Sequence, residues 1–116
     1  MPKRILLTHL DPVVETELRN TLLQLSAGWV LEEALDNSGS QVNWCNYDMV
    51  FCPPERAEVK TILAASTGLS HRLAVITASR IPEEREWVDM LEAGANDYVA
   101  RPFEEKQIGR LLAVCA

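Results

Sequence analysis

The sequence lacks several features that would point directly to a function. Its three cysteines, Cys45, Cys52 and Cys115, form no Cys-x-x-Cys pair, which argues against a disulfide scaffold and against a zinc site. No stretch approaches the roughly 18 consecutive apolar residues of a membrane-spanning helix. The glycine-rich loops that bind dinucleotides or nucleotide phosphates are also missing. These absences exclude the corresponding disulfide-rich, zinc-binding, membrane-spanning and nucleotide-binding classes.

Positive charge is scarce as well. The 11 lysines and arginines stand against 17 aspartates and glutamates, which gives a formal net charge of −6. Nucleic acids and anionic membranes are bound by basic faces. We therefore expect this chain to bind neither nucleic acid nor a membrane. The apolar run after Lys3 and Arg4 ends at Thr8 and is too short for a signal peptide, so a cytoplasmic protein is expected.

Short apolar runs alternate with helical patterns along the whole chain. Five runs are typical of strands buried on both faces: 5–7, 29–31, 49–52, 73–76 and 98–100. Helical patterns follow them at 11–28, 41–45, 55–68, 81–94 and 103–116, the second being the weakest because residues 36–40 are turn-rich. This alternation predicts a parallel sheet covered on both faces, a three-layer α/β/α sandwich in one domain over residues 1–116.

In such folds ligands bind outside the carboxyl ends of the strands. The residues that follow the predicted strands are therefore the candidate site: 8–11, 53–55, 77–80 and 101–102. An enzyme is the least favoured interpretation, because the serines and cysteines have no credible base nearby. His9 and His71 are predicted at opposite ends of the sheet and cannot form a pair.

Four segments resemble the receiver domains of bacterial response regulators. They are Lys3–Leu7 followed by Asp11-Pro12, then 47–51, 74–78 and 91–103, of which the last is the most specific. The resemblance covers essentially the whole chain. It implies a flavodoxin-like fold with five parallel strands in the order 2-1-3-4-5, five helices, and a role in two-component or phosphorelay signalling. Because receivers usually precede an output domain, the N-terminal part of a longer regulator is one expectation.

The resemblance also shows what is missing. Receiver domains accept a phosphoryl group on an aspartate after the third strand, and two acidic residues after the first strand hold Mg²⁺. The acceptor position falls here on Pro53, which has no nucleophile. The acidic pair falls on His9 and Leu10, where leucine cannot bind a metal and histidine favours softer metals. Asp11 matches a neighbouring position and serves equally well as a helix cap.

The phosphate-reading part of the family's switch is better kept. Thr77 matches a hydroxyl that contacts the phosphoryl group, and Tyr98 matches the aromatic switch residue. Arg101 replaces a lysine and precedes Pro102, and in this family that peptide bond is typically cis. A purely structural role remains open for each residue. Thr77 could be a strand-end hydroxyl bonded to the backbone, Tyr98 a half-buried aromatic, and Arg101 a locally paired charge.

Two functional interpretations follow from this pattern. In the first, the chain is a pseudo-receiver that is not phosphorylated, binds no Mg²⁺ or other cofactor, and acts by protein–protein interaction. Its partner would be a histidine kinase, an output domain or a second copy, bound on the surface of the fourth helix, fifth strand and fifth helix. The candidate interface residues are Trp87, Asp97, Glu104 and Lys106, although core packing is the simpler role for Trp87. The alternative is a switch in which Thr77 and Arg101 bind an anion or small ligand.

Overall fold

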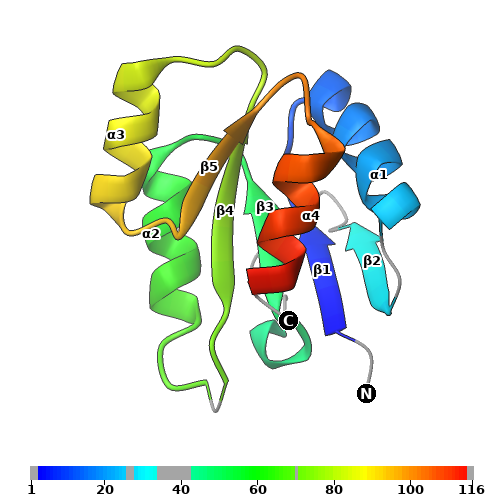
Figure 1. Ribbon diagram of the computed structural model, residues 1–116. Helices are drawn as coiled ribbons and strands as arrows, with labels where there is room; N and C mark the ends of the chain where they lie inside the picture. Colours follow the sequence, from blue (N-terminus) through cyan, green and yellow to red (C-terminus); the bar gives the residue numbers. More distant parts are fainter. Residues whose placement is uncertain (1–2, 26–27, 34–42, 70, 115–116) are drawn as a thin grey trace.

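The central sheet has five parallel strands in the order β2-β1-β3-β4-β5 (Figure 1). The computed structural model describes residues 3–25, 28–33, 43–69 and 71–114. The strands are β1 (Lys3–Leu7), β2 (Trp29–Glu33), β3 (Met49–Cys52), β4 (Ala74–Ser79) and β5 (Asp97–Ala100). The predicted strand order is confirmed. Its direction reverses between β1 and β3, where ligands bind in folds of this type.

Among the described residues, four α-helices cover the sheet, together with one short 3₁₀ helix. The α-helices are α1 (Pro12–Leu25), α2 (Arg56–Ala65), α3 (Glu84–Ala93) and α4 (Glu105–Val114). The prediction of five helices is wrong for the described residues. Its second helix at 41–45 falls partly outside them, and the part that is described belongs to the 3₁₀ helix η2 (Trp44–Asn46). β3 begins at Met49 and leaves no room for a further helical turn.

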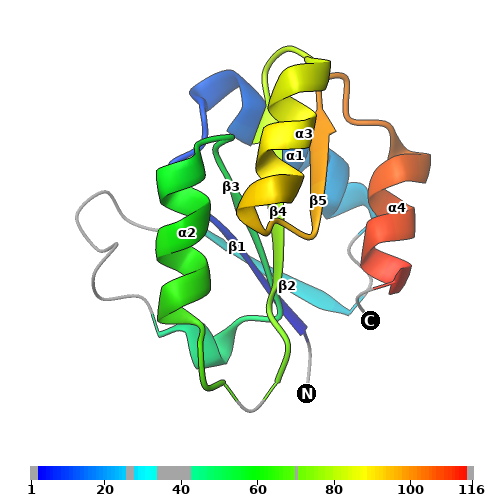
Figure 2. The same ribbon diagram turned by 90° about the vertical axis from the view of Figure 1, so that its left-hand side faces the viewer.

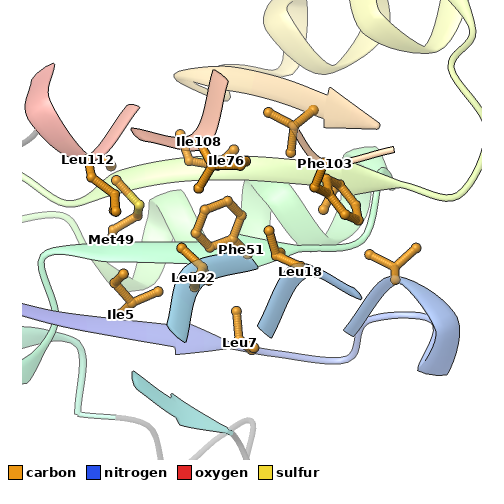
Figure 3. Packing of buried hydrophobic residues seen from close by; sticks show 14 residues of the cluster. Ile5, Leu7, Leu18, Leu22, Met49, Phe51, Ile76, Phe103, Ile108 and Leu112 are labelled. Carbon is orange, nitrogen blue, oxygen red and sulfur yellow. The ribbon is translucent and has the colours of Figure 1, made fainter. Parts of the chain in front are cut away.

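The sheet separates two apolar clusters. Helices α1 and α4 lie on one face and helices α2 and α3 on the other (Figures 1 and 2). Alternate strand residues point to opposite faces, so Leu6 packs with α2 and α3 while its neighbours Ile5 and Leu7 pack with α1 and α4. On the face covered by α1 and α4, the ring of Phe51 lies among side chains from these two helices (Figure 3). This arrangement holds the carboxyl ends of the strands at one edge.

Two details of the predicted elements need correction. β4 extends to Ser79, three residues beyond its predicted end, so Thr77 lies within the strand rather than after it. On α3, the apolar residues Trp87, Met90 and Leu91 are predicted to face the core. Met90 is buried, but Trp87 and Leu91 are exposed. Met90 and Ala93, three residues apart, fix the face that α3 turns to the sheet, and this rotates Trp87 and Leu91 outward.

In the described part of the chain, no helix has the length and apolar character that a membrane crossing requires.

Candidate functional site

A cleft of about 510 Å³ opens at the carboxyl ends of β1, β3 and β4, where the strand order reverses. Its walls come from the segments that follow these three strands. They include His9, Leu10 and Asp11 after β1, Pro53, Pro54 and Glu55 after β3, and Ser79, Arg80, Glu83 and Glu86 from the end of β4 to the start of α3. The structure therefore brings together residues from three of the four predicted groups, 8–11, 53–55 and 77–80. The cleft lies at the switch point of the strand order, where ligands bind in folds of this type.

The side chains of the loop after β1 contact other parts of the protein. His9 adopts the left-handed backbone conformation, with a φ of 54°, and its Nδ1 lies 2.8 Å from Oε1 of Glu58 on α2. Leu10 packs against the apolar core. Within the described residues, no group of three or more histidine, cysteine or acidic side chains could hold a metal ion.

Asp11 acts as the cap of α1. Its Oδ1 accepts hydrogen bonds from the N–H groups of Val13 at 2.8 Å and Val14 at 3.5 Å. This is the usual role of an aspartate before a helix, because the first N–H groups have no partner inside the helix. Its Oδ2 lies 3.9 Å from Nη1 of Arg80. The carboxylate next to His9 and Leu10 therefore serves to cap a helix.

The end of β3 carries no nucleophile. Pro53 is buried, and its carbonyl accepts the N–H of Glu55 at 2.8 Å. Cys52 beside it is fully buried, and burial, followed by the nearby charges of Glu58 and Glu55, raises the pKa of its thiol to about 12. A thiol with this pKa stays protonated at neutral pH, and only the thiolate is reactive.

Thr77 and Arg101 do not meet in the cleft. Thr77 is buried in β4 opposite Cys52, and its hydroxyl lies 3.5 Å from the carbonyl oxygen of Asp97, which accepts the hydrogen bond. The guanidinium of Arg101 forms an ion pair with Glu17 on α1, through Nε. The Arg101–Pro102 peptide bond is cis, as the resemblance implied. Neither Thr77 nor Arg101 is among the described residues that line the cleft.

Tyr98 is turned inward beneath the segment that joins β4 to α3. Only 9% of its surface is exposed, and its hydroxyl donates to Oε1 of Glu86 at 2.7 Å. The hydroxyl oxygen of Tyr98 in turn accepts the N–H of Glu83 at 3.4 Å. Burial raises the pKa of the Tyr98 hydroxyl, and the Glu86 carboxylate adds to this effect. Tyr98 therefore links β5 to one wall of the cleft.

The remaining predicted residues lie along α3, β5 and the start of α4. These three segments are side by side, with β5 between the two helices (Figures 1 and 2). Trp87, Glu104 and Lys106 are exposed, whereas Asp97 is half-buried and its Oδ1 accepts the N–H of Tyr98 at 2.7 Å. The predicted interface residues thus lie on one side of the molecule.

Several partners of these residues were not recognised in the sequence. Glu17, Glu58, Arg80 and Glu86 each pair with a predicted site residue. Glu86 lies in an acidic stretch that is typical of a solvated helix end. No local pattern marks such partners, because each comes from a segment distant along the chain.

No protein-family model and no curated protein sequence matches the chain. Among solved structures, the signal receiver domain of a DNA-binding response regulator from Colwellia psychrerythraea is similar, with a TM-score of 0.72 and 18% identity. That match covers 96% of this chain and 98% of the other. An atypical orphan response regulator, whose structure revealed a phosphorylation-independent regulatory mechanism, matches with a TM-score of 0.67 and 23% identity over 97% and 93% of the two chains.

A protein from Burkholderia thailandensis assigned to pilus assembly is also similar, with a TM-score of 0.73 and 12% identity over 99% and 98% of the two chains. At these identities the likeness concerns the fold. The chain has the receiver-domain fold, which structures of orphan and atypical regulators share.

Proposed function

We propose that this chain is a signal-transduction domain of the response-regulator type that is not switched by phosphorylation and acts through contacts with other proteins. The receiver-domain fold supports the general class. The side chains at the cleft support the proposal that the domain is not switched by phosphorylation. Pro53, His9 and Leu10 line it, and the resemblance implies that they stand in for the acceptor aspartate and the metal-binding acids.

The chemistry of phosphorylation requires groups that these positions lack. An acyl phosphate forms on a carboxylate, and Mg²⁺ prefers oxygen ligands that include carboxylates. Two of the carboxylates that do line the cleft already have structural roles, since Asp11 caps α1 and Glu86 accepts the Tyr98 hydroxyl. Glu55 is exposed at the start of α2. We infer that the cleft takes up neither a phosphoryl group nor Mg²⁺.

Contacts within the protein take the place of a phosphoryl ligand. Glu86 holds Tyr98 inward, and Glu17 holds the guanidinium of Arg101 against α1. A ligand shifts a conformational equilibrium only when it binds the two states with different affinity. Without such a ligand the domain keeps one conformation, which supports recognition through a constant surface.

The proposed recognition surface is formed by α3, β5 and α4 and includes Trp87, Asp97, Glu104 and Lys106. Three of these side chains are exposed and free to meet a histidine kinase, an output domain or a second copy of the chain. The phosphorylation-independent orphan regulator offers a precedent for the same fold working without the modification. We propose a cytoplasmic, non-enzymatic domain without a cofactor.

The alternative proposal, an anion-sensing switch at Thr77 and Arg101, gains no support from the geometry. The Thr77 hydroxyl is buried in β4, and the Arg101 guanidinium is paired with Glu17 on α1. An anion would first have to displace Glu17.

Beryllofluoride, a non-covalent mimic of a phosphoryl group on an aspartate, tests this proposal by NMR. Amide spectra of the labelled protein are recorded with Mg²⁺ and fluoride, before and after beryllium is added. We expect no saturable shift at Thr77, Tyr98 or Arg101, because the acceptor carboxylate and the metal ligands are missing. A saturable shift that requires both Mg²⁺ and beryllium would contradict the proposal.

A further inference from the structure

Helix α3 exposes apolar side chains on its outer face. Trp87, Val88 and Leu91 are 44%, 42% and 39% exposed, and they lie within five consecutive residues. Single exposed apolar residues are common on protein surfaces. Three neighbouring ones on a ten-residue helix, including a tryptophan, form a patch of the kind that partners bury.

Unpaired negative charge surrounds this patch. Residues 81–94 contain five acidic residues and one basic residue. Glu83, Glu84, Asp89 and Glu92, together with Arg85 and Val88, line a shallow groove of about 560 Å³. Across the described residues, none of these four carboxylates takes part in an ion pair.

The groove runs along the side of α3 that faces α2. Nη1 of Arg56 on α2 donates to the carbonyl oxygen of Asp89 at 3.3 Å, which places Asp89 on that side. The two helices lie next to each other on the same face of the sheet (Figure 2). The groove is therefore distinct from the side of α3 that adjoins β5.

Glu84 and Glu86 in the first turn of α3 are favourable at the positive end of the helix, but two other features of its charges are not. Glu86, Asp89 and Glu92 follow one another at intervals of three residues, a spacing at which like charges repel. The last turn contains Glu92 and no basic residue, although the carboxyl end of a helix favours positive charge. A cationic partner would relieve both effects.

We propose that the outer face of α3 binds a basic amphipathic helix of a partner protein. Apolar side chains of that helix would cover Val88, Leu91 and Trp87, and its lysines and arginines would pair with the carboxylates of the groove. This follows the general mode in which an amphipathic helix packs into an apolar groove and charge complementarity selects the partner. The inference rests on the proposed function and adds the chemistry of the partner.

A second copy of the chain fits this surface poorly. Each copy carries a formal charge of −6, so two copies repel each other. The exposed part of α4 offers Lys106 and Arg110, but Glu104 and Glu105 lie beside them. A separate protein with a basic helix is the better match.

Selection from a peptide library tests the proposal without assuming the answer. A random library of peptides about 18 residues long, five turns of helix, is displayed on phage and selected on the immobilised chain. We expect enriched peptides to carry a net positive charge and apolar residues at spacings of three and four. Enrichment of neutral or acidic peptides, or no enrichment, would overturn the proposal.

Two matched variants then locate the binding surface. Glu92→Lys reverses one charge in the groove, and Glu105→Lys makes the same change on α4. Affinity for the enriched peptides should fall about fivefold with Glu92→Lys and stay within about twofold with Glu105→Lys. Equal effects of the two changes would place binding elsewhere and refute the proposal. Circular dichroism establishes that both variants are folded.

The double change Val88→Ala and Leu91→Ala tests the apolar part. It should weaken peptide binding about tenfold or more, because both side chains lose their burial against the partner. Undiminished binding would contradict the proposal. A failure of these peptide experiments leaves the proposed function standing, since that depends on the absence of phosphorylation, which is measured independently.

Discussion

At the residue scale, the end of β3 decides which chemistry the cleft supports. Cys52 is the last residue of β3, and Pro53 follows it in the wall of the cleft. The Cys52 thiol is buried and its pKa is raised to about 12, chiefly by that burial. Neither residue is a nucleophile at neutral pH.

The thiols should react accordingly. Cys45 is exposed and Cys52 is fully buried. Iodoacetamide at neutral pH should modify Cys45 in the native protein and leave Cys52 unmodified until the protein is unfolded, because reaction needs an accessible thiolate. Peptide mapping by mass spectrometry measures both sites. Equal rates at Cys45 and Cys52 would show that the end of β3 is open.

The ionisation of Tyr98 tests its bond to Glu86. The chain has two tyrosines, so Tyr47→Phe leaves Tyr98 as the only phenol. We expect the Tyr98 pKa to lie above the usual value of about 10, since burial raises it most. Adding Glu86→Ala should lower the pKa, because the hydrogen bond that favours the neutral hydroxyl is lost.

The matched control is Glu83→Ala, since Glu83 contacts the Tyr98 hydroxyl through its backbone N–H only. Ultraviolet absorbance of the phenolate follows the titration. Folding raises the pKa of Tyr98, so its protonated hydroxyl contributes to the free energy of unfolding in full below about pH 10. This contribution is lost as the pH rises through the folded-state pKa. Equal titration of the two variants would mean that Glu86 does not hold Tyr98.

Some of these residue roles could be predicted from the sequence and others could not. Asp11 as a helix cap depends on neighbours two and three positions away, and the structure confirms it. The pairing of Arg101 with Glu17 depends on how the segment after β5 approaches α1 in three dimensions. The sequence contains both residues but no information on their distance.

At the element scale, the end of α3 depends on Gly94. Its φ is +111°, and a Cβ added there would lie 2.6 Å from Cδ1 of Leu63 on α2. Gly94→Ala should therefore lower the free energy of unfolding by more than about 1 kcal/mol, through backbone strain together with a steric clash.

Gly68→Ala is the control that measures the backbone strain without the steric clash. Gly68 also has a positive φ, of +90°, but an added Cβ would meet nothing within 4 Å. Urea denaturation of both variants should show the larger loss for Gly94→Ala. Equal losses would mean that the contact between α2 and α3 adapts at no cost.

The elements themselves were predicted unevenly. Continuous apolar runs located all five strands, including the edge strand β2, which is only half-buried. The end of β4 was missed because Thr77 and Ser79 are polar although buried. The orientation of α3 was missed for a different reason. Apolar spacing alone cannot tell a core residue from an exposed one, and Trp87 and Leu91 share their spacing with residues that do face the sheet.

At the scale of the whole molecule, the fold and the missing carboxylates are separate findings. Alternating strands and helices were sufficient to predict a parallel sheet with helices on both faces, because right-handed crossovers leave few other arrangements. The strand order, implied by the resemblance, is confirmed. The cleft at the edge of the sheet follows from that topology, but its chemistry depends on a few side chains that the fold does not dictate.

We expect no covalent phosphorylation of this chain, and intact-mass spectrometry tests this most directly. The protein is incubated with acetyl phosphate and Mg²⁺ and its mass is recorded without delay, beside an active receiver domain treated identically as the positive control. We expect the mass of this chain to stay unchanged while the control gains one phosphoryl group. A gain of one phosphoryl group by this chain, lost again after hydroxylamine treatment as an acyl phosphate would be, would contradict the account.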